Sequence, residues 1–293
     1  MNPTDPQENN ESQPERSFFG IIVHSFFVIP FLIAVFCVLL FTAVYLLTRE
    51  QQTAYDYLED VKTGGLTKRW QAAFELSKIL ANPALTPHDE RFTAELSSAF
   101  KQSVHDDSRV RQYLALAMAR TGNPGFFDLL SEHINEEREE NLYAILYALG
   151  MLKDHRAVPV LEEFISHPQA RIRSVAVVAL GTIGDPSCKQ ILKKTLSDPE
   201  PNVQWGTAIS LAQMGDGSGE GILLQLLNRE ELAKYPEVDP QEQNHLILAA
   251  IEASTHLHDP ELDTVIQSLA HNDKNMNVRA AAMDYTNGRT SSH

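Results

Sequence analysis

The 293-residue sequence contains only two cysteines, Cys37 in an apolar run and Cys188 at the start of a predicted helix. No disulfide framework is therefore expected, and the redox state of the compartment stays open. The chain also lacks a basic excess, because 24 lysines and arginines stand against 39 aspartates and glutamates, a formal net charge of −15. Binding a phosphate backbone requires a basic surface that releases counterions, so this charge argues against a nucleic-acid partner.

The sequence also lacks the signatures of a catalytic centre. The glycines between residues 215 and 221 follow no predicted strand and precede no Lys-Ser/Thr pair, so we interpret them as turn glycines rather than a phosphate loop. His256, His258 and Asp259 resemble metal ligands on paper, but they lie where a predicted helix ends, and Asp259 is expected to cap the next helix. The sequence predicts no catalytic, cofactor-binding or metal site, and hence a protein that is not an enzyme.

Residues 18–47 form a long stretch without charge if His24 is neutral, and most of its residues are apolar. This pattern predicts a transmembrane helix, which at about 1.5 Å per residue exceeds a hydrocarbon core of roughly 30 Å and is expected to tilt, or to bend at Pro30. A cleavable signal peptide would have a basic start and a shorter apolar run, so we expect an uncleaved anchor. Residues 1–17, acidic and rich in proline, are expected to be a disordered tail.

Basic residues near the ends of a membrane helix indicate its orientation. Only Arg16 precedes the apolar stretch, whereas Arg49, Lys62, Lys68 and Arg69 follow it. The sequence therefore predicts a single-pass protein of the bacterial inner membrane whose C-terminal part is cytoplasmic. Residues 48–66 are expected to form a juxtamembrane helix that ends in a glycine hinge.

From residue 154 onward the sequence repeats with a period of 31 residues. Leucines recur in one helix of each unit and branched apolar residues in the other: Leu149, Leu180 and Leu211, then Val160, Ile191 and Ile222. The apolar residues have helical spacing, and neither helix can bury its stripe alone, so the copies must stack as a solenoid. Asn123, Asp154, Asp185 and Asp216 occupy one position of four units and are interpreted as helix caps.

Residues 172–186 read Ile-Arg-Ser-Val-Ala-Val-Val-Ala-Leu-Gly-Thr-Ile-Gly-Asp-Pro. This motif resembles the HEAT repeat, in particular the armadillo-like, phycobilin-lyase-type HEAT-like form. The resemblance implies an all-α fold: a right-handed α-α solenoid of HEAT-like repeats, preceded here by one transmembrane helix. We expect about six units over residues 67–289, with an acidic loop inserted at residues 230–241. The deoxyhypusine hydroxylase family holds di-iron with His-Glu dipeptides, and this sequence contains none.

The resemblance implies that the second helix of each unit lines a concave surface. Outward positions on these helices are expected to provide a protein interface, because aromatic and arginine side chains are favoured anchors: Trp70, Arg111, Tyr143, Tyr147, Arg173 and Trp205. The alternative is that the two tyrosines pack between repeats. Replacing Arg173 and Trp205 is expected to weaken binding at nearly unchanged stability, whereas replacing the buried Leu180 is expected to destabilise the array.

The sequence therefore predicts a membrane-anchored HEAT-repeat scaffold that mediates protein–protein interaction at the membrane surface. Its partners are expected to include membrane proteins, with no cofactor and no small-molecule substrate. The alternatives are an accessory subunit of a larger integral-membrane transport or assembly complex, and a cofactor-handling factor of the phycobilin-lyase kind.

Overall fold

The computed structural model describes residues 24–48, 52–132 and 134–290, and the chain divides into two compact units at Gln51/Gln52. The first unit contains a π-helical turn, His24–Val28, followed by α2, Ile29–Thr48. Within it Phe26–Val44 is long and apolar enough to cross a membrane, and its side chains are exposed. Pro30 is the second residue of α2, directly after the π-helical turn. The predicted tail lies outside the described residues.

The second unit is all-α over its described residues and consists of helix pairs. The first helices of the pairs are α3 (Ala54–Thr63), α5 (Glu90–Gln102), α7 (Phe127–Ser131), α9 (Ala157–Glu162), α11 (Cys188–Lys193), α13 (Glu220–Leu226) and α16 (Pro260–Asn272). The second helices are α4 (Leu66–Ile79), α6 (Ser108–Arg120), α8 (Glu139–Leu152), α10 (Ala170–Ile183), α12 (Pro201–Gln213), α15 (Pro240–Ser254) and α17 (Met276–Thr290). These are seven pairs in the described residues, against the expected six or so.

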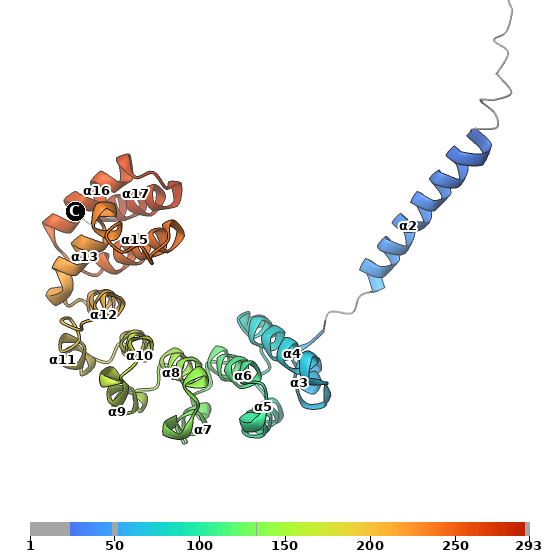
Figure 1. Cartoon of the computed structure of the whole chain (residues 1–293), viewed down its shortest axis with the longest axis horizontal. Helices are drawn as coiled ribbons and strands as arrows, with labels where there is room; N and C mark the ends of the chain where they lie inside the picture. The colour runs from blue at the N-terminus through green and yellow to red at the C-terminus, as the bar shows by residue number, and fades with distance from the viewer. Residues whose placement is uncertain (1–23, 49–51, 133, 291–293) are drawn as a thin grey trace, which may run out of the picture. The chain divides into compact units, whose positions relative to one another are not determined.

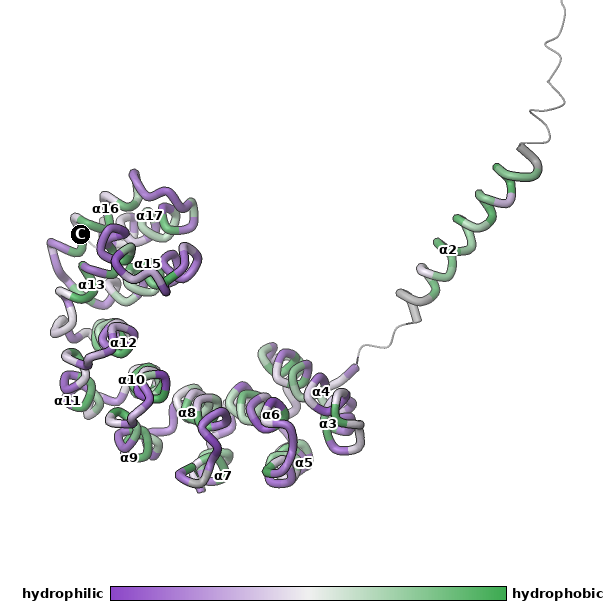
Figure 2. The backbone as a smooth tube through the Cα atoms, viewed as in Figure 1, coloured by the Kyte–Doolittle hydropathy of each residue, from purple (hydrophilic) through white to green (hydrophobic). Residues whose placement is uncertain are grey.

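The second helices form what we call the inner row of the solenoid. From α4 to α12 each of them contacts the next, and Figure 1 shows them on the inner side of an arc, with the first helices outside. Hydrophobic and hydrophilic residues are mixed along the helices of this unit, whereas α2 is mostly hydrophobic (Figure 2). Each helix of the array therefore buries one stripe between the rows. Leu180 is fully buried, as predicted.

Glycines allow the inner row to pack closely. A Cβ atom at Gly150 of α8 would lie 2.6 Å from Ala179 Cα of α10, and one at Gly181 of α10 would overlap Ser210 of α12. These two glycines are 31 residues apart in the sequence. The repeat therefore conserves a backbone contact from one unit to the next, and any side chain there would push the helices apart.

The turns between the inner and outer rows have one recurring geometry. A residue with positive φ ends the second helix: Gly122 (65°), Lys153 (53°), Gly184 (71°) and Gly215 (70°). The residue that follows, Asn123, Asp154, Asp185 or Asp216, accepts a hydrogen bond from the backbone N–H two positions later at 2.8–3.0 Å. The predicted caps are confirmed, with Lys153 adopting the conformation that glycine adopts in the other turns.

The structure corrects the prediction of a separate juxtamembrane helix at residues 48–66. Ala54, Leu58 and Val61 of α3 are buried in the main core, and the Tyr55 ring packs edge-on against Phe92 with centroids 5.3 Å apart. Arg69 Nε also donates to Val61 O at 2.7 Å, which ties α4 to α3. The apolar face that suggested a membrane-proximal helix is therefore the buried face of the first repeat.

The inserted segment is only partly the acidic loop that the sequence suggests. Residues Arg229–Leu232 form the short helix α14, and the apolar side chains Leu232 and Val238 are buried. They belong to a second core cluster, which adjoins the main cluster around α12. The insertion thus replaces the short connection between the first and second helices of one repeat, α13 (Glu220–Leu226) and α15 (Pro240–Ser254), with a packed segment.

Candidate protein-binding surface

The six residues predicted as interface anchors have different environments in the structure. Tyr143 and Tyr147 lie one turn apart on α8 and are 38% and 39% exposed, so both point away from the core. The guanidinium of Arg171, on α10, stacks over the Tyr143 ring at 4.4 Å from its centroid. This cation–π contact joins two neighbouring helices of the inner row on their accessible side.

Side chains at 31-residue intervals extend this exposed surface. Leu116, Tyr147, Val178 and Ile209 occupy equivalent positions on α6, α8, α10 and α12. Val178 is 37% exposed, and Leu116 and Ile209 are half-buried. Together with Tyr143 we call these residues the inner stripe. It presents aliphatic and aromatic side chains on consecutive repeats, an arrangement that suits an elongated protein ligand.

Trp205 is not an outward residue, which corrects the prediction. It is only 4% exposed, and its ring packs edge-on against Tyr235 with centroids 5.0 Å apart. Trp205 follows Tyr143 by two periods of 31 residues, so the repeat itself would leave it accessible. The inserted segment covers it instead.

Arg111 and Arg173 are also structural rather than free. Arg111 is 7% exposed, forms an ion pair with Glu137 and donates from Nη1 to Phe100 O at 2.9 Å. Arg173 makes a two-pronged ion pair with Asp198, with both N–O distances 2.8 Å. Burial raises the pKa of Asp198, but the hydrogen bonds from Arg173 and from the Glu200 N–H outweigh it, and the net pKa lies below the usual value.

These arginines belong to a recurring set of ion pairs between neighbouring repeats. In each pair, an arginine near the start of a helix contacts an acidic residue in the turn that precedes the second helix of the next repeat. The pairs are Arg69 with Asp106, Arg111 with Glu137, Arg173 with Asp198 and Arg229 with Asp273. In the two central pairs the acid follows the arginine by 26 and 25 residues. For Arg111 and Arg173, that spacing is the sequence signal that indicates an ion pair rather than an interface anchor.

Trp70 has an intermediate environment. It is half-buried, and the Arg109 guanidinium lies 4.3 Å from its ring centroid, so part of the indole face is covered from the neighbouring helix. Of the six predicted anchors, Tyr143 and Tyr147 therefore retain the exposure that a protein interface requires.

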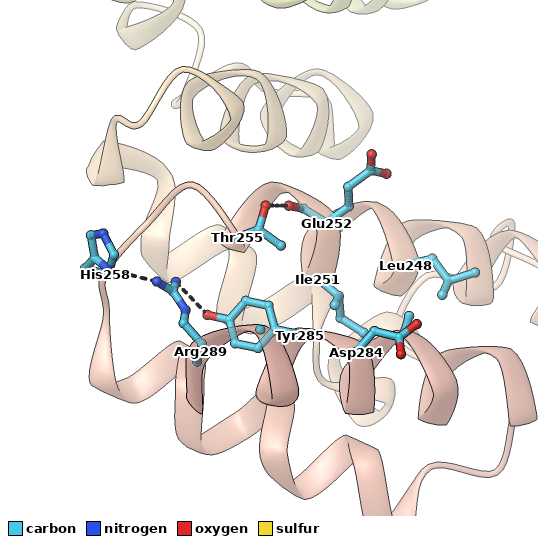
Figure 3. A pocket seen from close by; sticks show the side chains of 10 residues that line it. Leu248, Ile251, Glu252, Thr255, His258, Asp284, Tyr285 and Arg289 are labelled. Carbon is cyan, nitrogen blue, oxygen red and sulfur yellow. Dashed lines mark hydrogen bonds between the residues drawn. The ribbon is translucent and has the colours of Figure 1, made fainter. Parts of the chain in front are cut away.

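A groove that sequence reasoning missed lies between α15 and α17. It has a volume of about 610 Å³, an apolar floor that includes Leu248, Ile251 and Ala281, and polar residues around it (Figure 3). At one end Arg289 donates to His258 Nδ1 at 2.7 Å and to Tyr285 Oη at 3.0 Å. These residues come from separate repeat units, so no local sequence pattern predicts that they line one groove.

The histidines near residue 256 are part of the turn before α16. Asp259 accepts from the N–H groups of Glu261 and Leu262 at 2.9 Å, and is therefore the predicted cap, while His258 contacts Arg289. Within residues 24–48, 52–132 and 134–290 no three His, Cys, Asp or Glu side chains are grouped as metal ligands would be. Cys188 is buried, and burial raises the pKa of its thiol to about 11, which leaves it protonated at neutral pH.

Comparison with known proteins identifies the repeat. The profile of the HEAT repeats family matches residues 94–177 and 163–233. Among solved structures, the complex of CpcE and CpcF of phycocyanin lyase from Nostoc sp. PCC7120 is 18% identical, over 82% of this chain and 96% of that chain, with a TM-score of 0.55.

Two further structures are similar at lower scores. An archaeal HEAT-like repeats protein from Thermococcus onnurineus NA1 is 13% identical over 83% of this chain and 99% of that chain, with a TM-score of 0.40. Human deoxyhypusine hydroxylase in complex with glycerol is 15% identical over 80% of this chain and 96% of that chain, with a TM-score of 0.33. No curated protein matches the sequence. The fold is an all-α solenoid of HEAT-like repeats, and the family match lies within residues 94–233.

Proposed function

We propose that this protein is a HEAT-repeat scaffold that α2 anchors in a membrane and that binds another protein through the inner stripe. The observation that carries the proposal is the exposed tyrosine pair, Tyr143 and Tyr147, with Arg171 stacked beside it. A soluble helix rarely gains by exposing two aromatic rings on one face, whereas protein interfaces use them as anchors.

The rigidity of the inner row supports this role. α8 and α10 approach each other at Gly150, and the residues beneath the stripe, such as Leu146 and Ala176, are fully buried. Because the tyrosine backbones are already ordered, binding costs little conformational entropy beyond the side chains. Truncating one such anchor typically removes about 2 kcal/mol or more of binding free energy.

The proposal of an anchor rests on the length, composition and exposure of α2. Phe26–Val44 spans 19 residues without a charged side chain, and all of them are exposed. The basic residues that follow the apolar stretch favour a single-pass arrangement with the solenoid on the cytoplasmic side of a bacterial inner membrane. In this role the solenoid holds its partner at the membrane surface and carries out no catalysis.

The test is a double variant of the full chain, Tyr143→Ala with Tyr147→Ala, recovered from membranes in mild detergent. A photoreactive amino acid in place of Val178 would identify the protein that touches the stripe. We expect the crosslink to disappear in the double variant while the melting temperature stays nearly unchanged, because exposed substitutions change stability by only about 0.5 kcal/mol.

The matched control is Leu85→Ala with Val104→Ala, since both residues are 50% exposed and lie outside the inner row. A crosslink that survives the tyrosine variant, or is lost equally in the control, would contradict the proposed surface. Crosslinking predominantly to integral membrane subunits would instead favour an accessory role in a larger membrane complex.

A further inference from the structure

The groove between α15 and α17 combines an apolar floor with a rim that carries two carboxylates. Leu248 and Ile251 of α15 and Ala281 of α17 line it. Figure 3 shows Glu252 on the α15 side of the groove, next to Thr255, and Asp284 on the α17 side. Within residues 24–48, 52–132 and 134–290 neither carboxylate has a hydrogen bond or an ion pair, and the Thr255 hydroxyl donates to Glu252 O at 2.6 Å.

The positive charge at the other end of the groove is already used. Arg289 donates from Nη2 to Leu257 O, to Ser254 O at 3.1 Å and to Tyr285 Oη at 3.0 Å, and it pairs with Asp263 at 3.6 Å. The guanidinium therefore closes the carbonyl end of α15 instead of attracting a ligand. What the groove offers to a ligand is apolar surface beside two carboxylates that have no partner in the described part of the chain.

The surroundings strengthen the negative potential. Residues 201–293 contain thirteen aspartates and glutamates against five lysines and arginines. Two of those basic residues, Arg229 and Arg289, are held in ion pairs with Asp273 and Asp263. A cationic ligand therefore approaches a surface whose charge favours it before any contact forms.

Charge also decides between possible occupants. Residues 1–17 of this chain hold four acidic residues and one arginine, and a second copy would add another net charge of −15. Both would be repelled from the rim. The occupant that complements the groove is a partner whose lysine or arginine lies next to an apolar side chain.

We infer that this groove binds a helix of the partner protein that carries a lysine or arginine beside a leucine-like residue. The aliphatic stem lies on Leu248, Ile251 and Ala281, and the cationic head lies at the rim that Glu252 and Asp284 line. Long basic side chains bury their stems and keep the charged head at a polar rim in this way. The inference rests on the proposed protein-binding function and adds a second contact region with stated chemistry.

The test uses the full chain in a neutral detergent and two fluorescein-labelled helical peptides of alanine, leucine and either lysine or glutamate at the same positions. Fluorescence anisotropy measures binding against salt concentration. We expect the lysine peptide to bind more tightly than the glutamate peptide. Glu252→Gln with Asp284→Asn should weaken it about five- to tenfold, as the loss of two partly exposed ion pairs predicts.

The matched control is Glu90→Gln with Glu163→Gln, which removes the same charge from two exposed carboxylates outside the inner row, and it should leave binding unchanged. Ala281→Phe fills the floor without altering charge and should also weaken binding. Equal weakening by both charge variants, or no preference for lysine, would overturn the inference. Competition by free spermidine at the peptide's own affinity would show a site for small amines and overturn it as well.

The two proposals fail separately. If Tyr143→Ala with Tyr147→Ala abolishes peptide binding and the groove variants do not, the lysine peptide binds the inner stripe, which overturns the groove and leaves the proposed function standing. If only the groove variants weaken binding, the groove inference holds, and the crosslink at Val178 decides the inner stripe independently.

Discussion

Trp205→Ala is the substitution for which the repeat pattern and the tertiary structure predict opposite results. From the repeat alone, position 205 is outward and its replacement costs little. In the structure the indole is 4% exposed and packs against Tyr235 of the inserted segment. Removing a buried aromatic side chain costs about 3–5 kcal/mol, of which about 0.5–1.5 kcal/mol comes from the edge-to-face pair.

The expected loss of about 4 kcal/mol is much larger than the effect of a typical surface substitution. It approaches the whole free energy of unfolding of a marginally stable domain. It should appear as an early transition in guanidinium unfolding of the full chain followed by circular dichroism, because Trp205 belongs to the C-terminal core cluster. Trp205→Phe should recover part of the loss, and Tyr143→Ala serves as the exposed aromatic control.

A fluorescence measurement isolates the same residue. The chain has two tryptophans, so Trp70→Phe leaves Trp205 as the single indole emitter. We expect blue-shifted emission that iodide quenches poorly, and a red shift when Tyr235→Ala uncovers the ring. Red-shifted, readily quenched emission without that substitution, or a Trp205→Ala variant within about 0.5 kcal/mol of the parent, would refute the burial argument.

Three further predictions follow from the packing. Gly181→Ala should destabilise the array by about 1–3 kcal/mol because its Cβ would overlap Ser210, whereas Gly217→Ala, with no atom nearby, should cost far less in the same denaturation assay. Burial raises the pKa of Asp216, but hydrogen bonds from Lys193 and Ser218 outweigh it and lower this pKa from 3.8 to about 2. The ionised carboxylate therefore stabilises the fold above pH 4, and this contribution is lost as the pH falls toward 2. In Asp216→Asn the free energy of unfolding should depend less on pH in that range, and an unchanged pH profile would contradict the assignment. A chain that starts at Gln52 should be folded and monomeric without detergent. A chain that starts at Gly64 loses the buried side chains of α3 and should elute from gel filtration as aggregates. Equal elution of the two chains would show that α3 is dispensable.

The sequence by itself determined the features that depend on neighbours within one or two repeats. The 31-residue period places Leu180 in the core, and the asparagine or aspartate after each left-handed residue caps the next turn because its acceptor and donor are two positions apart. Such local geometry recurs wherever the motif recurs, so one repeat predicts the others. The apolar character of α2 was likewise readable from composition.

Only the tertiary structure decided which outward positions are accessible. Tyr143 and Trp205 have the same place in the repeat, yet one is exposed and the other is covered by Tyr235, which belongs to a segment that the period does not contain. Arg111 is buried because Glu137 reaches it from the next turn, and α3 joins the core because α4 and α5 lie beside it. Accessibility depends on which chain segments meet in space, and contacts with an insertion or across a turn leave no periodic trace in the sequence.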